Sequence, residues 1–351
     1  MTWRNDQRCL FLAILSLIIV GCDLPYYWQA THGQLSLLQQ RQSIEQILSQ
    51  QSEPESVLHQ LDYSQQVRKF AVQQLGLENN NSYQDYVDLK RPYVVWNVFA
   101  TPALSLNNHT WCYPIAGCTA YRGYFSEQQA QEYAATLDAQ GLDTYVSGAV
   151  AYSTLGWFDD PILNTFLEYD NLTLAALLFH ELAHQTLFVK NDTLFNESYA
   201  SALETLLLQR WAESHYPITA WQQYQRAQKR HQQFLDLVLE NKAQRQALFE
   251  SDRSKQEKHS EKSRLIQQLQ KRYQQFKQHW NHYSGYDDWF DTDLNNAQLS
   301  SVSAYSELTP YFLSLFRQTH EDIPSFIEAC RQLAWLPLPE RHQQLKSPDL
   351  P

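Results

Sequence analysis

The sequence predicts an α+β fold in which helices predominate, with a small β-sheet and a long helical hairpin toward the C-terminus. Apolar residues recur at helical spacing over most of the chain, whereas residues 93–152 are rich in β-branched and aromatic side chains. Of the 351 residues, 43% are hydrophobic, so the chain can bury a substantial core. Its length leaves one large domain or two smaller ones open.

The N-terminus has the form of an export signal. Arg4 and Arg8 precede an apolar run, residues 10–20, which is short for a transmembrane helix and is followed by a glycine and Cys22. A small residue directly before cysteine at the end of such a run is typical of a bacterial lipobox. Residues 1–21 are therefore predicted to be a cleaved signal peptide and Cys22 to carry a lipid anchor. An ordinary secretory signal or an uncleaved anchor is the alternative.

The next residue and the net charge limit location and partners. Asp23 resembles the signal that retains bacterial lipoproteins in the inner membrane, so the expected location is the cell envelope, anchored there and facing the periplasm. The formal net charge is −11, from 38 acidic and 27 basic residues. Because phosphate binding needs a basic surface, this charge disfavours nucleic acid as the main partner, and none is expected.

The cysteines fit an exported protein. In an oxidising compartment Cys112 and Cys118 are expected to form a disulfide that closes a short loop. A metal role for this pair would call for a second pair, which does not accompany it. Cys330 lies in an amphipathic pattern and is expected to be a buried thiol.

Helices and strands are expected in the following order. A short aromatic lead, residues 23–34 with Tyr26, Tyr27 and Trp28, precedes helical spacing that begins at Leu35 and runs to Gly76. Strands follow, and among them a helix that Ser126 caps and Gly141 ends. The strand-like runs are residues 93–100, 121–125, 144–148 and 149–152.

The rest of the chain reads as helical. One helix is expected from about residue 170 to residue 190 and a second from Leu194 to Glu213. Residues 221–282 are dense in charged and amide side chains with intermittent apolar ones, which predicts a solvated helical hairpin that turns near 251–260. A partner-binding coiled coil is the alternative, but the heptads are broken. Residues 283–351 form a C-terminal helical region, with a helix over 323–336 and a polar tail that Pro337 and Pro339 open.

One motif carries chemistry. His180 and His184 enclose Glu181 in the pattern HExxH, and histidines four apart share a helix face on which both rings can bind one zinc ion. Glu181 then stands near the open side of the metal, where a carboxylate can take a proton from water. A five-residue pattern can arise by chance, so the prediction depends on a third ligand.

The next expected helix offers that ligand. Glu197 lies 13 positions after His184, and the turn between the helices allows them to pack so that Glu197 faces the histidines. Glu204 is expected to orient a histidine N–H instead, with Asn196 as a further supporting residue. Asp192 is expected to cap the helix.

Together these segments resemble the gluzincin arrangement, in which HExxH is followed by N-E-x-x-A. More closely, the chain resembles a family of bacterial lipoproteins that are described as zinc aminopeptidases. The resemblance implies a zincin-like catalytic region over residues 22–220, completed by residues 283–351, and hydrolysis of peptide substrates. The blocks that carry it are Tyr26-Tyr27-Trp28-Gln29-Ala30, Gly33-Gln34-Leu35, Trp96-Asn97-Val98-Phe99-Ala100, 111–114, 121–125, 151–161 and Leu294-Asn295-Asn296-Ala297 with Tyr305.

The expected mechanism is general-base hydrolysis at Zn²⁺ held by two histidines and Glu197. Glu181 takes a proton from the attacking water and returns it to the leaving amine. A further donor should stabilise the oxyanion. Tyr305 is the candidate, with Tyr152 and Tyr199 as alternatives.

The sequence does not decide whether the enzyme cuts at the N-terminus of a peptide or inside the chain. An aminopeptidase binds a free α-ammonium, and some gluzincins use the glutamate of a G-x-M-E-N segment, where this chain has Ala151. Glu204, Asp159 or Asp160 could substitute, although the aspartate pair also suits a turn before a proline. An endopeptidase and a cell-wall peptide amidase are therefore alternatives. A non-catalytic, zinc-containing envelope scaffold is a third, against which the presence of Glu181 argues.

Overall fold

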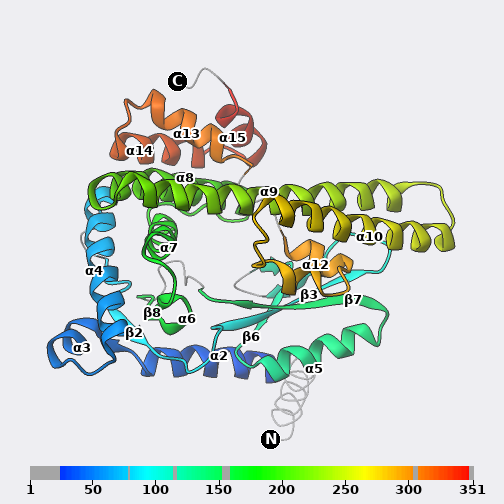
Figure 1. The fold of residues 1–351 in the computed structure, drawn as a ribbon, viewed down its shortest axis with the longest axis horizontal. Coiled ribbons are helices and arrows are strands. Elements are labelled where there is room, and N and C mark those ends of the chain that lie inside the picture. Colours follow the sequence, from blue (N-terminus) through cyan, green and yellow to red (C-terminus); the bar gives the residue numbers. More distant parts are fainter. Residues whose placement is uncertain (1–23, 78–79, 114–116, 152–158, 303–306, 348–351) are drawn as a thin grey trace, which may run out of the picture.

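The computed structural model describes residues 24–77, 80–113, 117–151, 159–302 and 307–347, and helices predominate in it (Figure 1). The α+β class is the one predicted. Within these ranges, no helix combines the length and apolarity needed to cross a membrane. The helices are α2 Leu24–Gln39, α3 Ile44–Gln50, α4 Glu55–Leu75, α5 Glu127–Asp138, α6 Asn164–Leu167, α7 Asn171–Ala183, α8 Thr193–His215, α9 Ile218–Glu250, α10 Lys255–His279, α11 Asp287–Phe290, α12 Asn296–Ser301, α13 Thr309–Gln318, α14 Ile323–Ala334 and α15 Leu338–Leu345.

Within the described residues, the strands form three small sheets. One has the order β6-β3-β7 and is antiparallel throughout, one has the order β1-β2-β8, and the third is the β4-β5 hairpin. The strands are β1 Gln42–Ser43, β2 Asp85–Val87, β3 Val95–Pro102, β4 Trp111–Tyr113, β5 Gly117–Thr119, β6 Arg122–Tyr124, β7 Leu142–Ala149 and β8 Ile162–Leu163.

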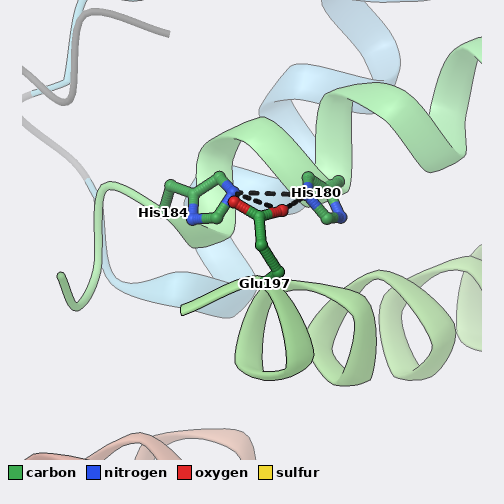
Figure 2. A group of neighbouring side chains, drawn as sticks. All are labelled: His180, His184 and Glu197. Atoms are coloured by element: carbon green, nitrogen blue, oxygen red, sulfur yellow. Dashed lines mark hydrogen bonds and ion pairs between the residues drawn. The ribbon is translucent and has the colours of Figure 1, made fainter. Parts of the chain in front are cut away.

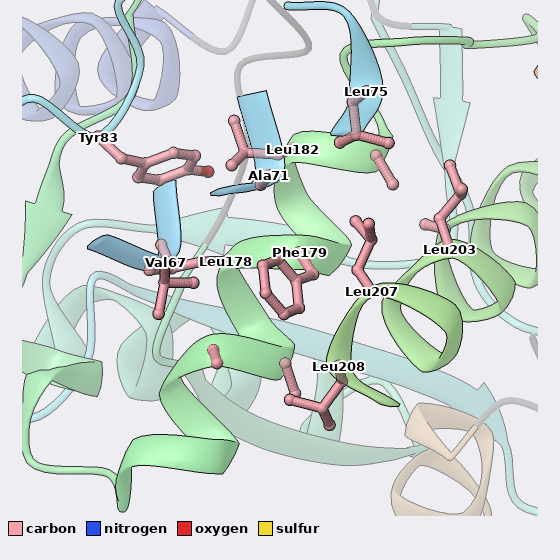
Figure 3. Close-up of a cluster of buried hydrophobic side chains, with 14 of the residues drawn as sticks. Val67, Ala71, Leu75, Tyr83, Leu178, Phe179, Leu182, Leu203, Leu207 and Leu208 are labelled. Atoms are coloured by element: carbon pink, nitrogen blue, oxygen red, sulfur yellow. The ribbon is translucent and has the colours of Figure 1, made fainter. Parts of the chain in front are cut away.

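Helices α7 and α8 pack against each other at the centre of the main core. Asp170 caps α7 by accepting a hydrogen bond from Thr173 N at 3.1 Å, and Asp192 caps α8 through Phe195 N at 3.1 Å. Each fully buried leucine or phenylalanine here contributes about 1.5–3 kcal/mol relative to exposure. The side chains of this cluster in Figure 3 include Val67, Ala71 and Leu75 of α4, Leu178, Phe179 and Leu182 of α7, and Leu203, Leu207 and Leu208 of α8.

The β6-β3-β7 sheet has two unlike faces. Trp96, Val98 and Ala100 of β3 are buried in a cluster with residues of α5. Because side chains alternate along a strand, Val95 and Asn97 point to the opposite face. That face lines a cavity described below.

Two sequence-based expectations, one for the sheet and one for α2, need correction. The runs 144–148 and 149–152 were expected as two strands, but β7 is one continuous strand that ends at Ala149. The strand continues through Gly148, because Gly148 pairs with Trp96 of β3. Only glycine fits at this position, since a side chain would collide with the ring of Tyr93. The lead expected over residues 23–34 is likewise not a separate segment, because residues 24–34 lie within α2.

The hairpin of α9 and α10 projects from the molecule beside α12 (Figure 1). Its turn is closed by a capping box, in which Ser254 and Glu257 bond each other's backbone N–H. Near its turn, the hairpin is attached to the sheet and to α12 by polar contacts that are largely shielded from solvent. We call this set, Asp143, Arg245, Lys262 and Asn296, the hairpin junction.

The C-terminal helices α13 to α15 lie along the side of α8 that faces away from the sheets (Figure 1). The polar tail expected after Pro337 is wrong for residues 338–345, which form α15. Pro339 occupies the first turn of this helix, where a missing N–H costs no hydrogen bond. Arg341 of α15 bonds Asp192, so the last helix is tied to the start of α8.

Candidate active site

Three side chains from α7 and α8 converge on one point (Figure 2). His180 Nε2 lies 3.2 Å from His184 Nε2 and 3.3 Å from Glu197 Oε2. The remaining distance, between His184 Nε2 and Glu197 Oε2, is 3.7 Å. Tetrahedral zinc with bonds of about 2.0–2.1 Å separates its ligands by about 3.3–3.4 Å, so the three atoms fit the corners of one such site.

The chain geometry around the turn explains this convergence. α7 ends at Ala183, earlier than expected, but His184 keeps helical dihedrals and its N–H still bonds His180 O at 3.3 Å. The two rings therefore remain on one face. The Asn196 carboxamide bonds both N and O of Val189, each at 2.8 Å, which fixes the turn and sets Glu197 opposite the histidines.

Glu204 holds His180 from behind. Its Oε2 lies 3.1 Å from His180 Nδ1. Glu204 is about two helical turns beyond Glu197 on α8. A proton on Nδ1 donated to this carboxylate leaves the lone pair of Nε2 directed at His184 and Glu197. Glu204 is therefore placed to orient a ring rather than to join the three converging atoms.

The charges of the cluster are strongly coupled. Burial opposes a charged His180, but hydrogen bonds to Glu197 and Glu204 outweigh it and raise the pKa of His180 to about 10. Burial also opposes an ionised Glu197, yet hydrogen bonds to the two histidines lower the pKa of Glu197 to about 2. In the absence of a cation, a proton on His180 thus takes the position of positive charge.

Glu181 stands beside the cluster in a more apolar setting. Burial, the main cause, raises the pKa of its carboxyl group, and the nearby histidines oppose this only in part. A carboxylate whose pKa is raised by burial is a stronger base than an exposed one. Behind it lies a small enclosed space of about 10 Å³ that Tyr83 and Asp160 also line.

The cluster opens into a cavity of about 800 Å³. Its walls are α2, the Val95–Asn97 face of the sheet, and α7 with the start of α8. Among its described lining residues, Glu181 and Glu197 are the acidic ones and none is lysine or arginine. Aromatic side chains dominate the remaining wall: Tyr26, Tyr27, Tyr113, Tyr121, Phe125 and Phe188.

The tyrosines considered as oxyanion donors and the predicted lipid-anchor residues do not lie among the described cavity residues. Tyr305 and Tyr152 lie outside the described residues, as do Cys22 and Asp23. Tyr199 is fully buried, with its hydroxyl 2.6 Å from Thr186 Oγ1, and is not among the residues that line the cavity.

The acids considered as substitutes for a G-x-M-E-N glutamate do not line the cavity either. Asp159 is exposed, and its carbonyl accepts from Arg41 at 3.1 Å. Asp160 is buried, and its N–H bonds Ser82 Oγ at 3.2 Å. Glu204 is engaged with His180.

Asn97 is a cavity residue to which sequence reasoning gave no role. It lies in the middle of β3, paired with Gly123 and Ser147, and its carboxamide bonds no other described residue. A Cβ at Gly123 would lie 3.2 Å from Asn97 Oδ1, so the glycine leaves room for the amide. The available signal was an asparagine inside a strand-like run, where this residue type is depleted.

Cys112 and Cys118 form a disulfide that joins β4 to β5. Both flanking residues, Tyr113 and Thr119, line the cavity, so the bridge fixes part of its rim. Cys330 is a buried free thiol in α14.

Comparison with known proteins places the chain in a family. A family model described as "Putative aminopeptidase" matches residues 25–345. The chain belongs to this family. The match to the aminopeptidase family runs from α2 to α15, so it includes the converging side chains, every wall of the cavity and the hairpin. No curated protein and no solved structure gives a significant match.

Proposed function

We propose that this member of the aminopeptidase family is a zinc-dependent peptidase and that its active site is the cavity at α7 and α8. One observation carries the proposal: His180, His184 and Glu197 converge at tetrahedral spacing, with Glu181 lining the same cavity. Two imidazoles and a carboxylate are a ligand set of catalytic zinc, which keeps its fourth position for water or substrate. A purely structural site would have no use for the adjacent Glu181.

The residues divide the work as follows. His180, His184 and Glu197 hold zinc, which when bound supplies Lewis-acid chemistry at the peptide carbonyl and at a water molecule. Glu181 accepts the proton of the attacking water and delivers it to the leaving amine. Glu204 keeps the His180 ring in the required tautomer. Tyr305 stays our candidate for the donor to the oxyanion.

The sheet offers a binding mode for the peptide. The β6 edge is covered, because the Gln29 carboxamide bonds Gly123 O at 3.2 Å and Phe125 N at 3.0 Å. The β7 edge carries no further described strand, and its last residue, Ala149, lines the cavity. A peptide that pairs with β7 would run past Glu181, and the free Asn97 carboxamide could bond its backbone.

Family membership favours an aminopeptidase. The cavity, however, presents no described acid beyond the proposed ligand and base, so the α-ammonium would be held by those two groups and by neutral acceptors such as Asn97. An endopeptidase or a peptide amidase on the same residues is the second candidate, favoured by the absence of an additional acid from the described wall. The lipid anchor at Cys22 would hold either activity at the periplasmic face of the membrane.

The Glu181→Gln variant tests the catalytic proposal. Wild-type protein with zinc should cleave a peptide mixture, and the variant should lose about 10²–10⁴-fold in kcat while retaining zinc, because only the proton acceptor is removed. Glu213→Gln, an exposed change on α8, is the matched control and should leave the rate unchanged. Mass spectra of the products distinguish cuts that start at N-termini from internal ones. A zinc-loaded wild type that cleaves nothing would leave only the scaffold alternative.

A further inference from the structure

Helix α2 exposes an uncharged apolar stripe to solvent. Leu24, Trp28 and Leu35 have exposed fractions of 54%, 73% and 51%. At about 100° per residue, positions 24, 28 and 35 fall within about 40° of one another on the helix surface. The whole of α2 lacks aspartate, glutamate, lysine and arginine, although the protein carries a net charge of −11.

The stripe cannot turn inward, because the opposite side of α2 is fixed to the body of the protein. Gln29 bonds the β6 edge through both ends of its carboxamide. Gly33 packs so closely on Phe125 that an added Cβ would overlap the ring. Leu37 is buried in the main core. Rotating the helix to cover Trp28 would break all three contacts, so the stripe stays exposed in the folded chain.

The chain upstream identifies what covers the stripe. α2 begins at Leu24, two residues after the predicted lipidation site at Cys22, and two residues span at most about 7 Å. The body of the protein then has no linker that could carry it away from the bilayer. Tryptophan, with an apolar ring and one N–H donor, favours the headgroup region of membranes. We propose that Leu24, Trp28 and Leu35 lie against the headgroup region of the bilayer in which Cys22 is anchored.

This arrangement places the cavity beside the membrane. Tyr26 and Tyr27, in the first turns of the same helix, form part of the cavity wall. Tyr27 is five residues from Cys22 and so lies within about 17 Å of the anchor point. Peptides at the membrane surface would then reach the site more readily than peptides in the bulk periplasm. This statement about substrates rests on the proposed function.

Trp335 provides a matched control. It is 89% exposed and directly follows α14, a helix that lies on the opposite side of the molecule from α2 (Figure 1). If every exposed tryptophan contacted the vesicle, the lipids would quench the fluorescence of Trp28 and Trp335 alike. If α2 faces the membrane, the lipids will quench Trp28 and not Trp335.

The test uses the full-length lipidated protein in phosphatidylcholine vesicles whose acyl chains carry bromine near the headgroup, which quenches nearby tryptophan fluorescence. We expect Trp28→Phe to remove at least half of the bromine-dependent quenching and Trp335→Phe to leave it unchanged. Both changes are conservative and exposed, so folding is retained. Equal quenching in Trp28→Phe and wild type, or an N-terminal mass without lipid on Cys22, would overturn the proposal. Because the readout is fluorescence, Glu181→Gln protein should be quenched like wild type, which separates this proposal from the catalytic one.

Discussion

The proposed metal cluster, which is His180, His184 and Glu197, and the hairpin junction both shield charged groups from solvent, but they balance charge in opposite ways. At the junction, Lys262 Nζ lies 2.6 Å from Asp143 Oδ2 and 2.9 Å from Ala103 O. Arg245 bonds Leu294 O at 2.8 Å and Asn296 Oδ1 at 3.1 Å. The chain's own cations thus neutralise and bond the acceptors there.

The metal cluster has no such partner. Around His180, His184 and Glu197 the described lining residues include no lysine or arginine, and two further carboxylates, Glu181 and Glu204, stand nearby. A partly buried group of acceptors without a lysine or arginine nearby among the described residues supports our proposal that a zinc ion supplies the positive charge. The contrast teaches that a cluster of titratable residues indicates a metal site through the absence of a neighbouring lysine or arginine as much as through its candidate ligands.

The largest effect we expect at the junction is on stability. Lys262→Met leaves the partly buried Asp143 carboxylate with only the Asn296 N–H as a partner, which should lower the free energy of unfolding by about 1–3 kcal/mol. Zinc content and kcat should not change, because the lesion is remote from the cluster. Chemical denaturation and a peptidase assay check both parts. Arg264→Met, an exposed change on the same helix, is the control and should be silent; loss of zinc in Lys262→Met would show that the two regions are not independent.

A smaller effect should appear in the pH dependence of zinc binding. The pKa of His180 is raised from 6.5 to about 10 in the zinc-free protein, so at neutral pH a proton must leave before zinc binds. This proton stabilises the zinc-free fold below pH 6.5, and its contribution is lost as pH rises through 10. Raising the pH from 7 to 8 should therefore tighten zinc binding about tenfold. Competition with a chromophoric chelator measures this, and an affinity that does not vary with pH would mean that His180 is neutral without zinc.

The smallest effect should come from the uncharged cavity wall. Asn97→Ala removes a carboxamide that is free to bond a peptide backbone, and a hydrogen bond between neutral groups is worth about 0.5–1.5 kcal/mol. We expect KM to rise by about 2- to 10-fold with kcat nearly unchanged. Steady-state kinetics on one peptide would show it. Asn107→Ala, an exposed asparagine outside the cavity, is the control; equal KM values in both variants would remove Asn97 from the binding surface.

The local parts of the site could be predicted from the sequence. Two histidines four apart need only a helix to meet, and Glu197 needs only the short turn that Asn196 fixes. The N-caps of α5 and α8 follow from Ser126 and Asp192, whose side chains bond the first backbone N–H groups.

The long-range parts could not be predicted in this way. The cavity wall joins Gln29 of α2 to Gly123 of β6 across 94 positions, and no local pattern encodes that contact. α15 was missed because prolines signal breaks, although they also suit a first helical turn. Gly148 was taken as a strand end because its packing under Tyr93 is tertiary.

The zinc content of the purified protein tests the central claim most directly. Elemental analysis of wild type, isolated without chelators and supplied with zinc, should give one zinc per chain. Glu197→Ala should give essentially none, because the cluster loses a ligand, whereas Glu213→Ala on the same helix should match wild type. A wild type that binds no zinc, or a Glu197→Ala protein that keeps it fully, would contradict the account.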